Sequence, residues 1–346
     1  SDSFPADEST LFLHRHSHTS VIGLCSKFKS CEVFDDSNLT QNEFKPKSKL
    51  TFKEDFQRTK QLVEQNQTFD LVAFPAKDNF YGRTHLDLLE NLGGETHSGN
   101  PKLTLLDAAA FLPHADLDLR AAKPHFVVFS GYKLFGLPTS VGVLLVRQDV
   151  FPLLGKTYFG GGSRSLVNTN YKKQNFKLNF ERYEDGTLDF LGIAVFGQFL
   201  ENRIKNGAPK LPLNLVKWLE DELQKLQHAN SRKLVKIYSQ QGSGIVAFNL
   251  LDKNGKFVGH SVVHAELEKQ RVIARSGCVC NPGACYEALG LSDELVDKLV
   301  ESRKTCGDGQ DFEGDIPLGV VRLSFGYWNT KKDVQKVLKA VRKFLN

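Results

Sequence analysis

Short apolar runs alternate with amphipathic and polar stretches through the first half of the chain. Residues 103–106 and 126–129 form two such runs, with the length and continuous hydrophobicity of buried parallel strands. The segment between them is long enough for a right-handed crossover, and residues 142–147 follow as an antiparallel return strand. The pattern predicts an α/β fold with a large domain built on a mostly parallel sheet.

Helical spacing of apolar residues predicts further elements. Residues 52–65 predict an amphipathic helix, and residues 85–92 a shorter one. The other predicted elements are strands at 233–238 and 244–250 and helices at 190–204, 213–227, 261–270 and from about 330 to the C-terminus. Because Asn206-Gly207-Ala208-Pro209 breaks a helical run, we place a domain boundary there, between a large domain (1–206) and a smaller α+β domain (207–346).

Composition narrows the class of protein. A chain of 346 residues is long enough for two domains. The net charge of +5 is spread along the chain, and no apolar stretch approaches membrane-spanning length, so we expect no nucleic-acid and no membrane partner. The six cysteines do not form the pattern of a disulfide framework, which favours a reducing, cytoplasmic location. The absence of methionine predicts that the chain begins inside a longer or processed product.

Polar residues follow both central strands. Asp107 ends the first strand, and Ser130 and Lys133 follow the second. Ligands of open α/β sheets bind at the carboxyl ends of the strands, so we expect these side chains to converge on one crevice. An acid for a pyridinium nitrogen and a lysine for a Schiff base are what pyridoxal phosphate (PLP) requires. Taken singly, the lysine is equally compatible with a solvated surface residue and the acid with a helix cap.

A second candidate centre is the segment RSGCVCNPGACY at residues 275–286. Its glycines and proline predict a turn or mobile loop. The spacing C-x-C-x4-C does not match the usual zinc sites, and a disulfide is not expected in a reducing compartment. The remaining interpretation is a nucleophilic thiol, with the pKa of the thiol lowered by Arg275.

Two further patterns contain candidate binding residues. Arg322 lies inside an apolar strand, which is unfavourable unless the guanidinium meets an anion, either a substrate carboxylate or a protein acid. His14, His16 and His18 alternate, so on a strand they would share one face. Without a carboxylate or cysteine beside them, we do not expect these histidines to bind a metal.

Three segments together resemble a known family. They are DAAAFLP at 107–113, FSGYKLFGLPTSVGVLLVR at 129–147 and CNPGAC at 280–285. They resemble the class V aminotransferases of PLP-dependent fold type I, in particular the cysteine desulfurases, and among these the N-terminal module of the molybdenum cofactor sulfurases. Relative to that module we expect an N-terminally incomplete large domain, without the family's first glycine-rich turn, and no C-terminal MOSC domain.

The resemblance implies a role for each residue of the cofactor site. Lys133 is then the Schiff-base lysine, Asp107 pairs with the pyridine nitrogen, and Ser130 contacts the cofactor phosphate. Tyr132 is placed among the cofactor-binding residues as well. His18, in the HTSV segment, stacks on the pyridine ring and takes part in proton transfer, which leaves the other two histidines as neutral strand-edge residues.

The resemblance also implies the substrate and nucleophile positions. Cys280 is the nucleophilic cysteine, because it follows Arg-Ser-Gly and two further residues, and Arg322 binds the substrate α-carboxylate. Asn79 lies near the ring hydroxyl and the substrate, although an asparagine serving the turn before Gly82 fits the sequence nearly as well. Thr187, in an acidic-Gly-Thr turn, reaches the PLP phosphate of a partner subunit, which implies a homodimer.

The implied function is PLP-dependent sulfur transfer from L-cysteine through a persulfide on Cys280. Lys133 and His18 shuttle protons, and the acceptor is molybdenum cofactor or a sulfur acceptor protein. A general desulfurase for iron–sulfur or thiolation pathways is an alternative, although CNPGAC and Ala110 argue against it. A truncated, non-catalytic chain that dimerises or binds partners is another. An ordinary aminotransferase comes last, since it leaves the cysteine loop without a role.

Overall fold

The computed structural model describes residues 8–36, 50–91, 99–136, 141–170, 174–302 and 309–345. Its first half is organised around a six-stranded sheet, in which all neighbouring strands are parallel except the last pair. In spatial order the strands are β2 (Ser30–Phe34), β1 (Thr10–His14), β3 (Asp70–Pro75), β4 (Lys102–Asp107), β5 (Phe126–Ser130) and β6 (Gly142–Val146). The predicted parallel strands and their antiparallel return strand are thus confirmed, with ends that differ by one residue.

Burial on both faces explains why the central strands are continuously apolar. All six residues of β3 are buried. Val72 and Phe74 pack into a cluster on one face, while Leu71 and Ala73 pack into a cluster on the other. Successive side chains of a strand point to opposite faces, so a strand that is covered on both sides needs an apolar residue at nearly every position.

Helices and short elements surround this sheet. The amphipathic helix predicted at 52–65 is confirmed as α2 (Phe52–Glu64), which begins with a capping box formed by Thr51 and Glu54. The helix predicted at 85–92 is confirmed only over α3 (Leu88–Asn91). The other elements of this half are α1 (Thr19–Ile22), η1 (Gly23–Lys27), α4 (Leu119–Ala122), α5 (Gly131–Phe135), η2 (Phe151–Leu153), β7 (Arg164–Val167), β8 (Gln174–Phe176), η3 (Phe180–Tyr183) and α6 (Phe190–Asn206).

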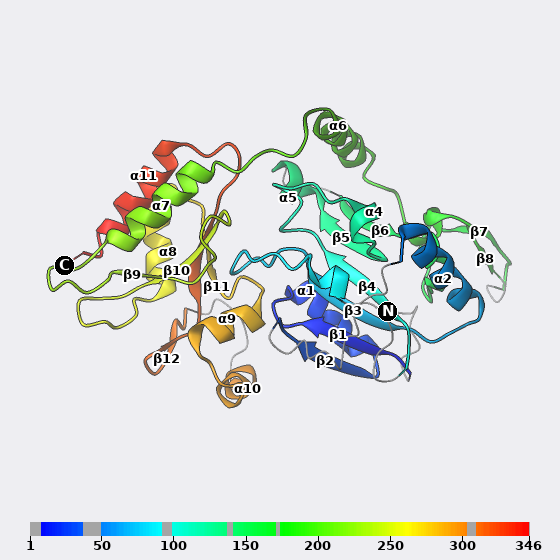
Figure 1. Ribbon diagram of the computed structural model, residues 1–346, viewed down its shortest axis with the longest axis horizontal. Coiled ribbons are helices and arrows are strands. Elements are labelled where there is room, and N and C mark those ends of the chain that lie inside the picture. Colours follow the sequence, from blue (N-terminus) through cyan, green and yellow to red (C-terminus); the bar gives the residue numbers. More distant parts are fainter. Residues whose placement is uncertain are drawn as a thin grey trace.

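The second half forms a separate antiparallel sheet covered by helices, which stands beside the first in Figure 1. Leu219, Phe248, Leu267 and Val341 belong to the core between this sheet and its helices. The sheet contains β11 (Arg275–Gly277), β14 (Val320–Ser324), β10 (Ile245–Leu250) and β9 (Val235–Ile237). The remaining elements are α7 (Leu213–Lys225), α8 (His260–Lys269), α9 (Pro282–Leu289), α10 (Asp293–Ser302), β12 (Phe312–Glu313), β13 (Ile316–Pro317) and α11 (Lys331–Arg342). The placement of the domain boundary at 206 stays a prediction.

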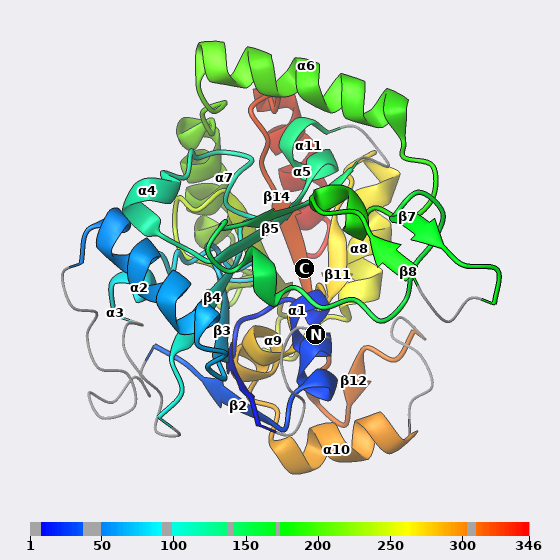
Figure 2. The same ribbon diagram turned by 90° about the vertical axis from the view of Figure 1, so that its right-hand side faces the viewer.

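Helix α6 lies across the top of the molecule in Figure 2 and has no buried residue. Its Phe199 stacks on Phe135 of α5, with ring centroids 4.7 Å apart. Other apolar side chains face outward, including Leu191 and Ile204, which are 82% and 84% exposed. None of the described helices is both long and apolar enough to cross a membrane.

Three expectations about local structure were wrong. Strand β1 ends at His14, so His16 and His18 lie beyond the strand and do not continue its face. His14 and His16 are buried, because β1 lies inside the sheet between β2 and β3 and is not an edge strand. The six cysteines were not expected to form a disulfide framework, but Cys25 and Cys31 form a disulfide across Cα atoms 5.3 Å apart, a separation that a disulfide spans.

Candidate active site

Three side chains predicted to converge lie around one cavity at the carboxyl edge of the large sheet. Asp107 is the last residue of β4, Ser130 is the last residue of β5, and Lys133 lies in α5 directly afterwards. All three line a cavity of about 300 Å³. Because β4 and β5 are adjacent and parallel, their carboxyl ends open at the same edge, which explains the convergence.

The polar groups of this cavity are incompletely paired. The hydroxyl oxygen of Ser130 is buried and has no hydrogen-bond partner in the described part of the chain. Asp107 accepts a hydrogen bond of 3.0 Å from the amide of Ala109. Buried hydroxyl groups normally have partners, so the unpaired Ser130 oxygen marks a position where a polar group of a ligand fits.

His18 lines the same cavity and caps the N-terminus of α1. Its Nδ1 accepts a hydrogen bond of 3.2 Å from the amide of Ser20, which assigns the proton of the neutral ring to Nε2. Burial and the nearby positive charge of Lys133 lower the pKa of His18. The imidazole is therefore neutral at neutral pH.

A second cavity of about 350 Å³ adjoins the first and includes residues of the small domain. Arg275, Cys280 and Arg322 line this second cavity. Four of the predicted site residues line both cavities, namely His18, Asn79, Tyr132 and Lys133. The cysteine loop and the lysine therefore face a common space, although they belong to different halves of the chain.

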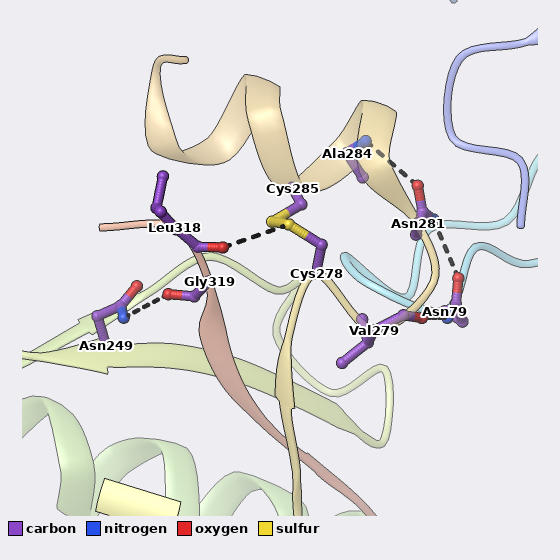
Figure 3. Close-up of a disulfide and its surroundings, with 9 residues drawn as sticks. All are labelled: Asn79, Asn249, Cys278, Val279, Asn281, Ala284, Cys285, Leu318 and Gly319. Atoms are coloured by element: carbon purple, nitrogen blue, oxygen red, sulfur yellow. Dashed lines mark hydrogen bonds between the residues drawn. A yellow bond between two sulfur atoms is a disulfide. The ribbon is translucent and has the colours of Figure 1, made fainter. Parts of the chain in front are cut away.

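Cys280 lies in a loop closed by a disulfide between Cys278 and Cys285, shown in Figure 3. A disulfide was not expected here, and that expectation was wrong, because the turn brings the two Cα atoms to 5.2 Å. Val279 and Cys280 have left-handed backbone conformations, with φ of 48° and 59°. Cys280 keeps a free, exposed thiol, and its carbonyl accepts a hydrogen bond of 2.9 Å from the amide of Thr19.

Asn79 connects the two halves of the site. Its side-chain amide donates to the carbonyl of Val279 at 2.8 Å, and its carbonyl oxygen Oδ1 accepts from Asn281 at 3.0 Å (Figure 3). The turn before Gly82 is served instead by Asp78, whose Oδ1 accepts backbone amides that include the amide of Gly82. Asn79 therefore faces the site, and its neighbour Asp78 is the residue that stabilises the turn before Gly82.

Arg322 reaches the site from β14. Its Nη1 donates to the backbone carbonyl of Asn79 at 2.9 Å, and its buried Nε has no hydrogen-bond partner among the described residues. Burial and the like charge of Arg275 lower the pKa of Arg322 to about 10. No described carboxylate contributes to this pKa, so the alternative of a salt bridge to a protein acid is not observed in the described chain.

Two predicted residues are placed differently from the rest. Tyr132 is 47% exposed but lines both cavities, whereas Thr187 is exposed and lines neither.

Sequence reasoning missed Lys77 and Trp328, which line the second cavity. Lys77 donates to the carbonyl of Ser243, and burial lowers its pKa. Its only sequence signal was its position two residues before Asn79.

Comparison with known proteins identifies the family. Residues 43–337 match the model of the family described as aminotransferase class V. The chain belongs to the class-V aminotransferase family. This class-V aminotransferase is 33% identical over 98% of its length to a protein of Anopheles gambiae named molybdenum cofactor sulfurase, and 36% identical over 78% to one of the same name from Homo sapiens. It spans 45% and 32% of those two proteins, which is less than half of their length.

Solved structures confirm the fold of the class-V aminotransferase. The cysteine desulfurase CsdA of Escherichia coli has a TM-score of 0.67 and 19% identity, covering 97% of this chain and 72% of that one. A cysteine desulfurase of Thermococcus onnurineus has a TM-score of 0.66 and 20% identity, with the same coverage. The predicted PLP-dependent transferase fold, with a large mostly parallel sheet, is therefore confirmed.

The residues present fit PLP, the cofactor of this family. An unpaired buried hydroxyl at Ser130 matches a phosphate oxygen, the Asp107 carboxylate matches a pyridinium, and Lys133 lines the same cavity. The site can therefore hold the cofactor in the first cavity, with room for a small substrate in the second.

Proposed function

We propose that this chain takes sulfur from L-cysteine, holds it as a persulfide on Cys280 and delivers it to molybdenum cofactor. The observation that supports this most strongly is the shared cavity, in which the exposed Cys280 thiol faces the same space as Lys133 and Arg322. An ordinary aminotransferase has no use for such a thiol. The names of the relatives support the choice of acceptor.

In this proposal four side chains hold the cofactor. Lys133 Nζ attaches it, Asp107 keeps its ring nitrogen protonated, Ser130 Oγ donates to its phosphate, and His18 lies against its ring. PLP, when bound, supplies an electron sink for the substrate carbons. The neutral His18 ring carries its proton on Nε2 and lines the same cavity as Lys133, so these two side chains would hold and exchange the protons that the reaction moves.

Arg322 orients L-cysteine by its α-carboxylate. The guanidinium already uses Nη1 on the Asn79 carbonyl, and its unpaired Nε remains available for an anion. A planar guanidinium fork binds a carboxylate with two charge-assisted hydrogen bonds, which fixes the direction as well as the position of the substrate. Binding a carboxylate would also offset the repulsion that Arg322 experiences from Arg275.

Cys280 then accepts the sulfur. Its thiolate attacks the sulfur of the bound L-cysteine: an S–S bond forms, the Cβ–S bond breaks, and protonation at Cβ releases alanine. Arg275 Nη2 lies 3.9 Å from the Cys280 sulfur and donates a hydrogen bond to it. The exposed position of Cys280 leaves the persulfide accessible to an acceptor.

The proposal includes a homodimer. Three apolar side chains of α6, Phe190, Leu191 and Ile204, are 67%, 82% and 84% exposed, and several large apolar side chains exposed on one helix favour an interface. Thr187 is exposed close to the start of this helix, where it is available to a partner subunit. Light scattering of the purified chain should give twice the chain mass, and a monomer would contradict this part of the proposal.

The test of the reaction is spectroscopic and chemical. The chain with added PLP should show a visible Schiff-base band that Lys133→Ala lacks, and L-cysteine should then place one extra sulfur on Cys280, detected by mass spectrometry. Cys280→Ser is the matched control, because it should keep the band and lose the persulfide. Absence of a Lys133-dependent band would favour the alternative of a non-catalytic, dimerising chain.

The acceptor is tested separately. Persulfide-loaded chain is offered either molybdenum cofactor or a general thiolation acceptor, and transfer to molybdenum cofactor is expected to be faster. Preference for the general acceptor would favour a desulfurase for iron–sulfur or thiolation pathways. Cytoplasmic location stays a prediction, and cell fractionation would check it.

A further inference from the structure

Three buried histidines meet beside the cofactor cavity. His14 ends β1, His16 follows in the next turn, and His85 lies between β3 and α3. Their residues are 0%, 3% and 1% exposed. One ring nitrogen from each histidine lies within 4.8 Å of the corresponding nitrogens of the other two. The alternating histidines in the sequence included His14 and His16 but not His85. The addition of His85 makes a metal site a reasonable interpretation.

Each of these rings has one nitrogen next to a carboxylate. His14 Nε2 lies 3.2 Å from Asp36 Oδ1, and His85 Nδ1 lies 3.3 Å from Asp36 Oδ2. His16 Nε2 lies 3.0 Å from Glu287 Oε2. A histidine that binds a metal usually donates its other ring N–H to a carboxylate in this way, which fixes the tautomer and orients the free nitrogen.

Two of the opposite ring nitrogens are available as ligands. His16 Nδ1 and His85 Nε2 are buried and have no hydrogen-bond partner among the described residues. The third, His14 Nδ1, accepts a hydrogen bond of 3.1 Å from the amide of His16, which a bound metal would replace. Asp78, which is fully buried, places Oδ2 3.6 Å from His85 Nε2 and adds an oxygen donor. Buried unpaired nitrogens of this kind are rare in native proteins and require an explanation.

We propose that His14, His16, His85 and Asp78 form a binding site for a divalent transition metal of the zinc class. Zinc bonds of about 2.0–2.1 Å place tetrahedral ligand atoms about 3.4 Å apart. The His85–Asp78 separation of 3.6 Å already approaches that value, and the three ring nitrogens must close from at most 4.8 Å. Imidazole with carboxylate is a donor set that suits zinc.

The metal would connect the segments that carry the active site. His16 is two residues from His18, and Asp78 is next to Asn79. Glu287, which pairs with His16, lies on α9 immediately after the cysteine loop. Four protein ligands leave no open position, so the role is structural. The inference does not depend on the proposed sulfur transfer.

The experiment measures metal binding in the Cys280→Ser chain without a histidine tag, so that no free thiol of the cysteine loop competes. After dialysis against Zn²⁺ and then buffer, we expect one zinc per chain, and added Zn²⁺ should raise the melting temperature. Co²⁺ in place of zinc should give the intense visible bands of a tetrahedral site. His85→Gln in the same background should weaken zinc binding by more than about 100-fold, beyond the loss of an outer-shell partner.

Two further variants separate this site from adventitious binding. Glu287→Gln removes an exposed outer-shell partner and should weaken binding about 10- to 100-fold without unfolding the chain. His264→Gln is the control, because this half-buried histidine pairs with Glu268 on α8, away from the cluster, and should change nothing. Less than half an equivalent of zinc, a weak octahedral cobalt spectrum, or unchanged affinity in His85→Gln would overturn the proposal. If His85→Gln does not fold, the cobalt spectrum of the parent chain decides.

Discussion

Replacing Arg322 with methionine distinguishes a substrate-binding role from a structural one. In the folded chain Arg322 donates to the carbonyl of Asn79, and no described carboxylate offsets its charge. An arginine that stabilises the fold would pair with a protein carboxylate, and replacing that arginine would cost about 3–5 kcal/mol of stability. An arginine that binds a substrate anion should instead destabilise the protein while no substrate is bound.

The structure gives the size of this effect. Burial and the like charge of Arg275 lower the pKa of Arg322 from its ordinary value to about 10, and at about 1.36 kcal/mol per pKa unit the charged form is disfavoured by about 3 kcal/mol. Because the folded pKa lies below the unfolded one, the penalty is fully present below pH 10 and disappears as the pH rises through the unfolded value. Methionine removes the penalty but loses one hydrogen bond, worth about 1–1.5 kcal/mol. We therefore expect the free energy of unfolding of Arg322→Met to exceed that of the wild type by about 1–2 kcal/mol.

The same variant should be a poor enzyme. Loss of a charge-assisted carboxylate contact of about 3 kcal/mol lowers kcat/KM for L-cysteine about 100-fold. Urea unfolding of the PLP-free protein at pH 7 measures the stability, and alanine formation by the PLP-loaded protein measures kcat/KM. Arg58→Met is the control, because Arg58 is exposed on α2, away from the site, and its replacement should leave the unfolding midpoint unchanged. An Arg322→Met protein that is less stable by 1 kcal/mol or more would refute the reasoning.

Three other outcomes are expected. Cys280→Ala should leave the rate of PLP binding unchanged and abolish persulfide formation; any persulfide on the loop would contradict the assignment. Burial and Lys133 lower the pKa of His18, so the ring should stay neutral, and kcat/KM should stay constant, as the pH is lowered to about 6.5, the ordinary histidine value. A loss of kcat/KM that already begins above pH 6.5 on acidification would contradict a neutral His18. Arg147→Leu should destabilise the chain by about 3–5 kcal/mol in urea unfolding, because Arg147 forms ion pairs of 2.6 Å with Asp55 and Asp149; a loss below 1 kcal/mol would contradict this.

Sequence patterns predicted the parts of the site that follow from sheet topology. Asp107, Ser130 and Lys133 meet because adjacent parallel strands end at one edge, and this holds wherever the strands are correctly identified. The long helices were also predictable, because their apolar spacing is local information. The family resemblance gave the identity of Cys280, which spacing alone left among three thiols.

Contacts between distant segments could not be predicted in this way. His85 joins His14 and His16 only because the turn after β3 folds back against β1, and nothing in its own neighbourhood indicates this. The pairing of Cys278 with Cys285 depends on a turn with two left-handed residues, Val279 and Cys280, that are not glycine. Local propensity disfavours that conformation, and tertiary contacts impose it.

The bond between Arg322 and Asn79 has a consequence for the order of events in synthesis. It joins positions 243 residues apart, and the His16–Glu287 pair joins positions 271 residues apart. Contacts of such high sequence separation form late, because a long loop must close before they contribute. During translation the large sheet is complete well before β14 emerges. A nascent chain can therefore contain the part of the cavity lined by Lys133 while it still lacks the Cys280 thiol and the Arg322 guanidinium. The proposed sulfur transfer therefore becomes possible only after β14 has been made.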